Sequence, residues 1–254
     1  MINQISLGLI TIHVYGIIAS FSIFLAFIVT FKRAKKFKIK TDFVYDLFLI
    51  VFLFALVGAR LYHVIDQWSY YFHFPLKIFA IWEGGLAIYG ALIGGFFAVW
   101  LFSKTKKLNF LSLLDLIAPS VALAQSIGRW GNFFNQEAYG YPTNLSIGIH
   151  ILPQNRLLGF EQYQTFHPVF LYESLITFLI FLILIRLTPI LKKSPGKIAA
   201  IYFVLYGTGR FFLEFLRLDT QVLLILKPAQ FFSLFFIIIG VYLWKPNLFL
   251  KNLP

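Results

Sequence analysis

The stretch PVFLYESLITFLIFLILIRL, residues Pro168–Leu187, is an almost unbroken run of apolar side chains. About 20 apolar residues in helical form cross the hydrocarbon core of a bilayer. Pro168 stands where proline is favoured, in the first turn of a helix. This stretch therefore predicts a transmembrane helix, and it sets the class of fold for the chain around it.

The composition of the whole chain agrees with a membrane protein. The 254 residues are 59% hydrophobic and 20% aromatic, and the mean hydropathy is +0.81. Only 13% are charged, which is about half the share of a soluble domain. We predict an all-α polytopic membrane protein, and the length gives no reason to expect a further soluble domain. We also expect no cleavable signal peptide, because the N-terminus lacks a basic leader.

Further apolar runs repeat along the chain, and we predict seven transmembrane spans. Their ranges are Ile10–Phe31, Tyr45–Val64, Ile78–Phe102, Leu111–Ile127, Pro168–Leu187, Lys197–Phe215 and Ala229–Trp244. Asp115 and Pro119 interrupt the fourth span, and Gly207 and Gly209 interrupt the sixth. Such breaks are tolerated where neighbouring helices cover the backbone.

Lysine and arginine orient these spans. Fifteen of the 22 basic residues fall on alternate links and the tail: Lys32, Arg33, Lys35, Lys36, Lys38, Lys40, Lys104, Lys106, Lys107, Arg186, Lys192, Lys193, Lys197, Lys245 and Lys251. By the positive-inside rule that side is the cytoplasm. We therefore expect an external N-terminus and a cytoplasmic C-terminus. The net charge of +12 is explained by this topology, and we expect no nucleic-acid partner.

The external link after the fourth span is long and aromatic, from Gly128 to His167. Loops of this length are often functional. We predict a single integral-membrane domain over residues 1–254, with residues 128–167 as a small head outside the membrane.

Several arginines do not belong to the cytoplasmic clusters, among them Arg60, Arg129, Arg210 and Arg217. An arginine at the centre of a lipid-facing helix costs about 2.5–3.5 kcal/mol even on mild scales. These side chains should therefore face the bundle interior and have partners. A structural ion pair or a side chain reaching to the membrane surface is the alternative for each.

The stretch YGTGRFFLEFLR, Tyr206–Arg217, spaces Arg210, Glu214 and Arg217 at i, i+4 and i+7. On a continuous helix these three residues share one face. A glutamate between two arginines orients both and leaves one positive charge, which could hold an anion. Guanidinium groups match phosphate oxygens in geometry, and the abundant phosphate of a membrane is a lipid head group.

The stretch SIGRWGNFFNQEAYGYPT, Ser126–Thr143, gathers polar groups among aromatic ones. Arg129 offers a second guanidinium, Asn132 and Asn135 lie one helical turn apart, and Glu137 can orient an arginine or accept a proton. A capped turn at the membrane interface, with Trp130 and Tyr139 in the aromatic belt, is the alternative interpretation.

Three further motifs remain open. EGGLAIYGALIGG, Glu83–Gly95, is either a close helix contact through Gly90 and Gly94 or a pocket wall that presents Tyr89. IHVYG places His13 and Tyr15 near the outer end of the first span, and His167 in HPVFLYE fits a helix cap.

Other chemistries are poorly represented in the sequence. Motifs for serine hydrolases and zinc proteases are missing, and the chain has no cysteine nucleophile. Scattered His and acidic residues form no metal-ligand pattern, so we expect neither a metal nor a cofactor. A transporter for an anionic solute and a metal-dependent phosphatidyl transferase are the rival classes. A transporter should show internal repeats, and a metal-dependent transferase should show clustered aspartates. The sequence shows neither clearly.

The segment GRWGNFFNQEAYG, Gly128–Gly140, resembles the motif of bacterial prolipoprotein diacylglyceryl transferases. Five further segments occur in the order expected for this family: IHVYG, GARLYHV, EGGLAIYGALIGG, HPVFLYE and YGTGRFFLEFLR. The resemblance therefore spans nearly the whole chain. The resemblance implies seven spans with an external N-terminus, in the inner membrane. It also implies transfer of diacylglyceryl from phosphatidylglycerol to a lipobox cysteine of a prolipoprotein, with glycerol-1-phosphate released.

The resemblance and the charges together assign roles. Arg129 and Arg210 would bind and stabilise the lipid phosphate. The family match assigns the head-group pocket to Asn132, Glu137 and Gly140, with Glu137 also a catalytic candidate. Glu214 would orient Arg210, and Tyr15 and His13 belong to a motif close to the lipid.

Two positions depart from the family pattern. Tyr89 stands where some members have a histidine with a proposed base role, and a tyrosine titrates near 10, so we expect Tyr89 to position substrate. Tyr141 stands where many members have arginine.

Overall fold

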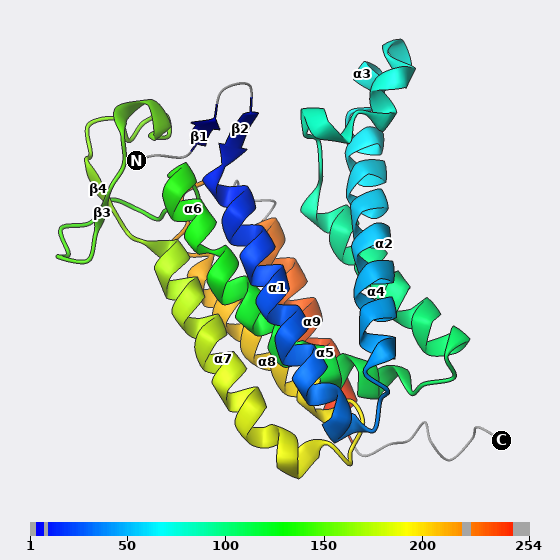
Figure 1. Cartoon of the computed structure of the whole chain (residues 1–254). Helices are drawn as coiled ribbons and strands as arrows, with labels where there is room; N and C mark the ends of the chain where they lie inside the picture. The colour runs from blue at the N-terminus through cyan, green and yellow to red at the C-terminus, as the bar shows by residue number, and fades with distance from the viewer. Residues whose placement is uncertain (1–3, 8–9, 220–224, 246–254) are drawn as a thin grey trace. The chain divides into compact units, whose positions relative to one another are not determined.

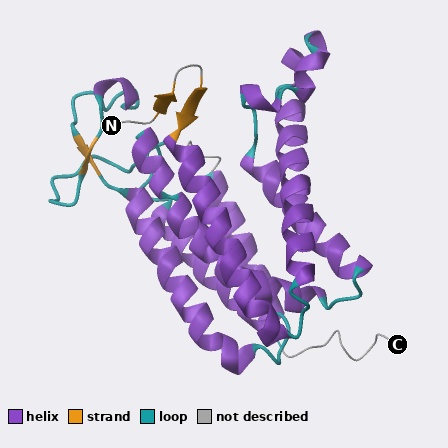
Figure 2. Cartoon of the chain, viewed as in Figure 1, coloured by secondary structure: helices purple, strands orange, loops and turns teal. Residues whose placement is uncertain are grey.

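The computed structural model describes residues 4–7, 10–219 and 225–245. Helices dominate these residues, with short strands and loops at their ends (Figure 2). The chain packs as two compact units. The bundle unit comprises Met1–Thr30 with Asp115–Pro254, and the hairpin unit comprises Phe31–Leu114.

The bundle unit is built from long helices that run beside one another (Figure 1). Its helices are α1 (Val14–Ala34, which continues into the hairpin unit), α5 (Phe110–Gly128, which enters from it), α6 (Trp130–Asn135), α7 (Val169–Leu191), α8 (Lys197–Leu213) and α9 (Pro228–Trp244). Two small antiparallel sheets pair β1 (Gln4–Leu7) with β2 (Ile10–His13), and β3 (Ile149–His150) with β4 (Thr165–Phe166). A 3-10 turn, η4 (Pro153–Asn155), lies between β3 and β4.

The hairpin unit is dominated by two paired helices, α2 (Asp42–Asp66) and α4 (Ile88–Thr105). Short elements precede and join them: η1 (Lys35–Phe37), α3 (Trp68–His73), η2 (Pro75–Phe79) and η3 (Ile81–Glu83). A Cβ added at Gly90 would lie 2.1 Å from the Gly58 carbonyl oxygen, and one added at Gly94 would lie 2.1 Å from that of Phe54. The prediction of a close helix contact through these glycines is confirmed.

Arg60 of α2 organises the link to α4. Its Nε donates to the carbonyl of Ile78 at 2.8 Å and its Nη1 to the carbonyl of Gly84 at 2.6 Å. The guanidinium also lies 5.2 Å from the centre of the Tyr71 ring. The prediction that this arginine has partners is confirmed, and they are backbone carbonyls and an aromatic face. Arg60 therefore has a structural role.

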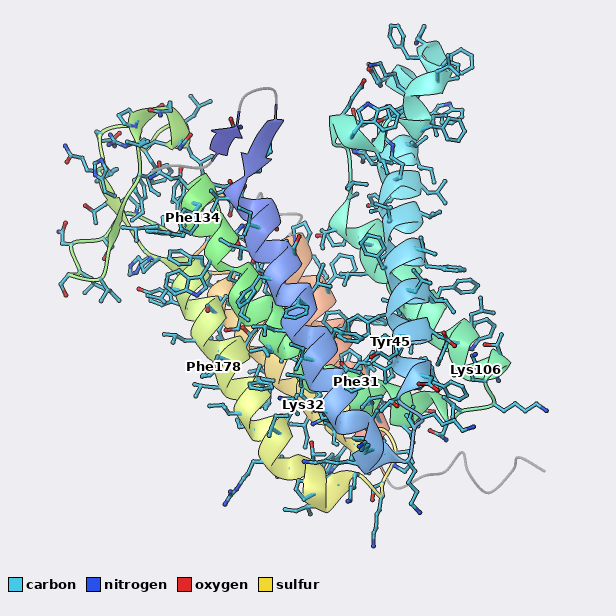
Figure 3. All side chains as sticks on the ribbon, viewed as in Figure 1. Phe31, Lys32, Tyr45, Lys106, Phe134 and Phe178 are labelled. Atoms are coloured by element: carbon cyan, nitrogen blue, oxygen red, sulfur yellow. The ribbon has the colours of Figure 1, made fainter. Side chains whose placement is uncertain are left out.

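Seven helices of 17 residues or more lie, among the described residues, at the seven predicted positions. Five segments are long and apolar enough to cross a membrane: Val14–Phe37, Asp42–Asp66, Ile88–Thr105, Phe110–Asn135 and Val169–Leu191. Apolar side chains project outward along α7, where Figure 3 labels Phe178, which is 41% exposed. The chain is thus a helical, multi-pass membrane protein.

The structure corrects the predicted elements at three places. The all-α prediction is wrong at the β1–β2 and β3–β4 pairs, because strand hydrogen bonds satisfy the backbone outside the helices. Residues Ile10–His13, predicted to begin the first span, form β2. The predicted third span loses its first turns to η2 and η3, and the Ile78 carbonyl of η2 binds Arg60. Two of the basic residues used to orient the spans are labelled in Figure 3: Lys32 in the last turn of α1 and Lys106 directly after α4. A third, Lys251, lies outside the described residues.

Asp115 of α5 caps the start of α8. Its Oδ2 accepts from the Gly196 N–H at 2.7 Å and its Oδ1 from the Ala199 N–H at 2.8 Å, and the residue is fully buried. The first N–H groups of a helix lack partners within the helix, and the cap residue Gly196 has no side chain to supply one. Helix α5 is continuous through both Asp115 and Pro119, so neither residue interrupts it as predicted. Asp115 instead caps the neighbouring helix α8.

We expect Asp115→Ala to destabilise the protein by about 2 kcal/mol, because two buried N–H groups lose a charged acceptor. The measurement is the thermal unfolding midpoint in detergent. Asp115→Asn keeps one acceptor oxygen and should fall between the wild type and Asp115→Ala. An unchanged midpoint in Asp115→Ala would contradict this account of the α8 cap.

Candidate functional site

The centre of the site is a carboxylate shared by two arginines. Glu173 lies near the start of α7 and is 3% exposed. Its Oε1 lies 2.5 Å from Nη2 of Arg129, and its Oε2 lies 3.3 Å from Nη1 of Arg210. The three residues come from the α5–α6 junction, α7 and α8. Burial requires such charges to be paired, so the two predicted arginines are held together by one carboxylate.

Neighbouring contacts on α5 and α7 hold this carboxylate in place. The Ser174 hydroxyl donates to the Ser126 carbonyl at 2.8 Å, which joins α7 to α5 next to Glu173. The Phe170 ring packs on Phe133 of α6, with centroids 5.2 Å apart. The helix register around Arg129 and Glu173 is therefore set by packing on both sides.

Glu214, at the end of α8, supplies the second carboxylate. Its Oε2 lies 2.7 Å from Nη2 of Arg210, and the residue is fully buried. Oε1 of Glu214 has no hydrogen-bond donor among the described residues. The predicted pairing of Arg210 with Glu214 is confirmed.

The prediction that Arg217 shares the helix face of Arg210 and Glu214 is wrong. Helix α8 ends at Leu213, and the chain turns before Arg217. Arg217 instead forms a two-pronged ion pair with Asp219, with N–O distances of 2.5 and 2.8 Å. Burial acts to raise the pKa of Asp219, but the Arg217 guanidinium holds that pKa below its usual value.

The predicted surplus of one positive charge is therefore not produced by Arg210, Glu214 and Arg217. Arg217 is neutralised by Asp219, and the four groups around Glu173 carry two positive and two negative charges. Any net positive charge at this end of α8 must come from another residue.

The polar side chains of α6 form their own network around Glu137. Asn132 donates to Oε1 of Glu137 at 2.9 Å, and Asn135 donates to the same oxygen at 3.3 Å. Glu137 is exposed. Of the two predicted roles of Glu137, orienting an arginine finds no ion pair among the described residues, where Glu173 pairs with Arg129 and Arg210. The other role, accepting a proton, stays a prediction.

Tyr15 brings the first helix to α6. A Cβ added at Gly131 would lie 2.4 Å from the Tyr15 ring, so this tyrosine packs directly on the glycine of α6. Its side chain remains 41% exposed. His13 ends β2, and its Nδ1 lies 3.4 Å from Nε2 of Gln4 across the hairpin. Tyr15 thus joins α1 to α6, whereas the His13 contact stays within the β1–β2 hairpin.

Gly140 lies where the chain after α6 passes the end of α8. Its N–H donates to the His167 carbonyl at 2.9 Å, and a Cβ there would lie 2.6 Å from the carbonyl oxygen of Leu216. The glycine therefore allows a close backbone contact next to Glu214.

The loop that follows is organised by two buried side chains. Gln136 accepts from the Leu152 N–H at 3.0 Å, and the Tyr139 hydroxyl donates to the Asn155 carbonyl at 2.7 Å. Tyr139 is 3% exposed and packs on Phe166. The alternative that Tyr139 belongs to an aromatic membrane belt is wrong.

Helix α6 covers residues 130–135, so the first part of the predicted head is helical.

His167 does not cap α7. Its Nδ1 lies 3.1 Å from the Tyr172 hydroxyl, and the residue before the helix is Pro168, which makes no side-chain cap.

Tyr89 belongs to the hairpin unit, in the first turn of α4. Its ring lies 6.0 Å from that of Tyr62, and the residue is 39% exposed. Its role in catalysis stays a prediction.

Sequence reasoning missed Glu173 as a site residue. The available signal was a glutamate inside an otherwise apolar span, which is costly in a membrane and usually functional. Tyr206 was also missed. It lies one turn before Arg210, and its side chain interacts with Arg129.

Comparisons with known proteins agree with the motifs. Residues 3–245 match the model of a family described as prolipoprotein diacylglyceryl transferase. The chain is similar to the phosphatidylglycerol–prolipoprotein diacylglyceryl transferase of Clostridium novyi, with 43% identity covering 90% of this chain and 89% of that protein. The Prochlorococcus marinus MIT 9301 protein of the same name is 39% identical, covering 94% and 90%. That of Trichormus variabilis is 40% identical, covering 93% and 86%.

Proposed function

Because this chain belongs to the prolipoprotein diacylglyceryl transferase family, we propose that Arg129 and Arg210 bind the phosphate of its lipid donor. The protein is a transferase of lipoprotein biosynthesis, and its substrates are phosphatidylglycerol and a prolipoprotein. It moves the diacylglyceryl group of the lipid to a cysteine thiol of the precursor and forms a thioether.

The observation that carries the proposal is the shared carboxylate. The Arg129 and Arg210 guanidiniums meet at Glu173, and their side chains are 25% and 12% exposed. Each guanidinium has more donors than this carboxylate uses. The remaining N–H groups can bind two oxygens of one phosphate.

The reaction asks for positive charge at the leaving group. The thiolate of the substrate cysteine attacks the glyceryl carbon next to the phosphate, a C–S bond forms and the C–O bond breaks. The electron pair leaves with glycerol-1-phosphate, whose phosphate gains negative charge as it departs. Fixed donors aimed at developing charge lower the barrier without reorganisation. Glu173 and Glu214 keep the two guanidiniums in place for this step.

The other residues are assigned to the lipid head group and to alignment. Asn132, with Glu137 and Gly140, would bind the glycerol end of phosphatidylglycerol. Tyr15 and His13 would line the adjoining wall. Tyr89 would position a substrate. The prolipoprotein would bind through its lipobox segment. The apolar part of this substrate would lie among the surrounding membrane lipids.

The activity is tested directly by incubating the purified protein with phosphatidylglycerol and a cysteine-containing lipobox peptide. The mass of the peptide should rise by that of one diacylglyceryl group. An unmodified peptide would contradict the proposed pair of substrates.

The membrane topology follows from the basic residues. The protein would lie in the bacterial inner membrane with seven spans, an external N-terminus and the site facing the outer side. We expect a reporter fused after Lys36 or Lys107 to read as cytoplasmic. A reporter within Gln154–Gln164 should read as external. A cytoplasmic reading from that segment would overturn the orientation of the chain and of the site together.

Donor choice tests the phosphate assignment. Phosphatidylethanolamine carries an ammonium group that would lie beside Arg129 and Arg210, and like charges repel. We expect its rate of transfer to be lower than that of phosphatidylglycerol by about a hundredfold. Equal initial rates in vesicles of matched acyl chains would remove the support for a site built on these arginines.

A further inference from the structure

Lys227 is a buried lysine at the start of α9. It is 9% exposed, and lysines this buried are rare unless they are paired. Its Nζ donates to the Glu214 carbonyl at 2.9 Å and to the Arg217 carbonyl at 2.5 Å. These carbonyls belong to the turn that closes α8. The lysine therefore holds the end of the helix that carries Arg210 and Glu214.

A second contact fixes the same junction. The backbone N–H of Lys227 donates to Oε1 of Gln230 at 2.9 Å, and Nε2 of Gln230 donates to the Phe211 carbonyl at 3.4 Å. Gln230 is 2% exposed. The start of α9 is thus tied to the last turns of α8 through side chains that have little room to move.

Lys227 adds a positive charge next to the arginine cluster, whose own two positive charges are balanced by two carboxylates. Its ammonium bonds to uncharged carbonyls, whereas Arg129 and Arg210 are matched by Glu173 and Glu214. Burial lowers the pKa of Lys227, while the Glu214 carboxylate acts in the opposite direction. The Nζ lies 2.9 Å from the backbone carbonyl oxygen of Glu214, which places the ammonium charge beside this residue.

We infer that Lys227 is a positioning residue for the phosphate site. It fixes the Arg210–Glu214 pair at the end of α8, and its charge offsets Glu214 so that the arginines keep positive potential for the lipid phosphate. This inference rests on the proposed function of Arg129 and Arg210.

The same helix pair contains a matched control at its other end. Lys197 begins α8, and its Nζ donates to the carbonyls of Leu243, Trp244 and Lys245 at the end of α9. Both lysines thus close the end of the neighbouring helix, and α8 and α9 lie side by side along their length (Figure 1). Lys197 makes no ion pair with a carboxylate among the described residues.

The experiment compares Lys227→Met, Lys227→Arg and Lys197→Met as full-length proteins, with lipidation kinetics and thermal unfolding measured side by side. We expect kcat/KM for phosphatidylglycerol to fall about tenfold in Lys227→Met and to recover to within about threefold of wild type in Lys227→Arg. Lys197→Met should lose as much thermal stability as Lys227→Met and keep its kcat/KM. Equal losses of kcat/KM in the two methionine variants would overturn the inference.

A double-mutant cycle with Glu214→Gln tests the charge effect. If Lys227 offsets Glu214, the double variant should lose less activity than the product of the single losses, by about fivefold. A loss of activity in the double variant equal to the product of the two single losses would overturn the inference. Full activity in Arg210→Lys would instead remove the proposed function of the arginines, so the two failures are distinguishable.

Discussion

Arg210→Lys should lower the rate of diacylglyceryl transfer about a thousandfold while the protein still folds. Lysine keeps the positive charge but loses the planar fork. In the structure that fork bridges Glu173 at 3.3 Å and Glu214 at 2.7 Å. A single ammonium cannot reach both carboxylates and a phosphate with the same geometry. The measurement is kcat for lipidation of a lipobox peptide.

A matched control is available on the neighbouring helix. Arg186 of α7 is exposed, and Arg186→Lys should leave kcat unchanged. Arg129→Ala should match the loss in Arg210→Lys, because the phosphate would lose donors that act while charge develops. Wild-type kcat in Arg210→Lys would show that net charge suffices and that guanidinium geometry does not matter.

Gly94→Ala should destabilise the protein by about 3 kcal/mol, a large effect for one added methyl group. The new Cβ would lie 2.1 Å from the Phe54 carbonyl oxygen and 2.9 Å from its carbonyl carbon. Backbone atoms cannot rotate away as a side chain can, so α2 and α4 must separate along their contact. The thermal unfolding midpoint of the purified protein in detergent measures this loss.

The adjacent glycine provides the control. A Cβ at Gly95 would lie 3.8 Å from a Val51 side-chain carbon, which is an ordinary contact. Alanine within a helix is favoured over glycine by about 0.5–1 kcal/mol. Gly95→Ala should therefore stabilise the protein slightly, with a sign opposite to that of Gly94→Ala. Destabilisation of equal size in both variants would show that the close α2–α4 contact is not what limits residue 94.

The sequence determined the class of this protein and the residues of its motif. A bilayer imposes a length of about 20 apolar residues on each helical span, and this constraint acts on each segment separately. The positions of the five segments that are long and apolar enough to cross a membrane could therefore be predicted. So could the pairing of Arg210 with Glu214, because four residues along one helix bring side chains together whatever surrounds them.

Tertiary structure decided which charges meet. Glu173 lies far from Arg129 and Arg210 in the sequence, yet it binds both because α7 packs against the α5–α6 junction and α8. Arg217 fits the helical spacing but follows the end of α8 and pairs with Asp219. A buried charge takes the partner that neighbouring elements present. That choice depends on which helices adjoin and where each one ends, and spacing along one segment carries no information about either.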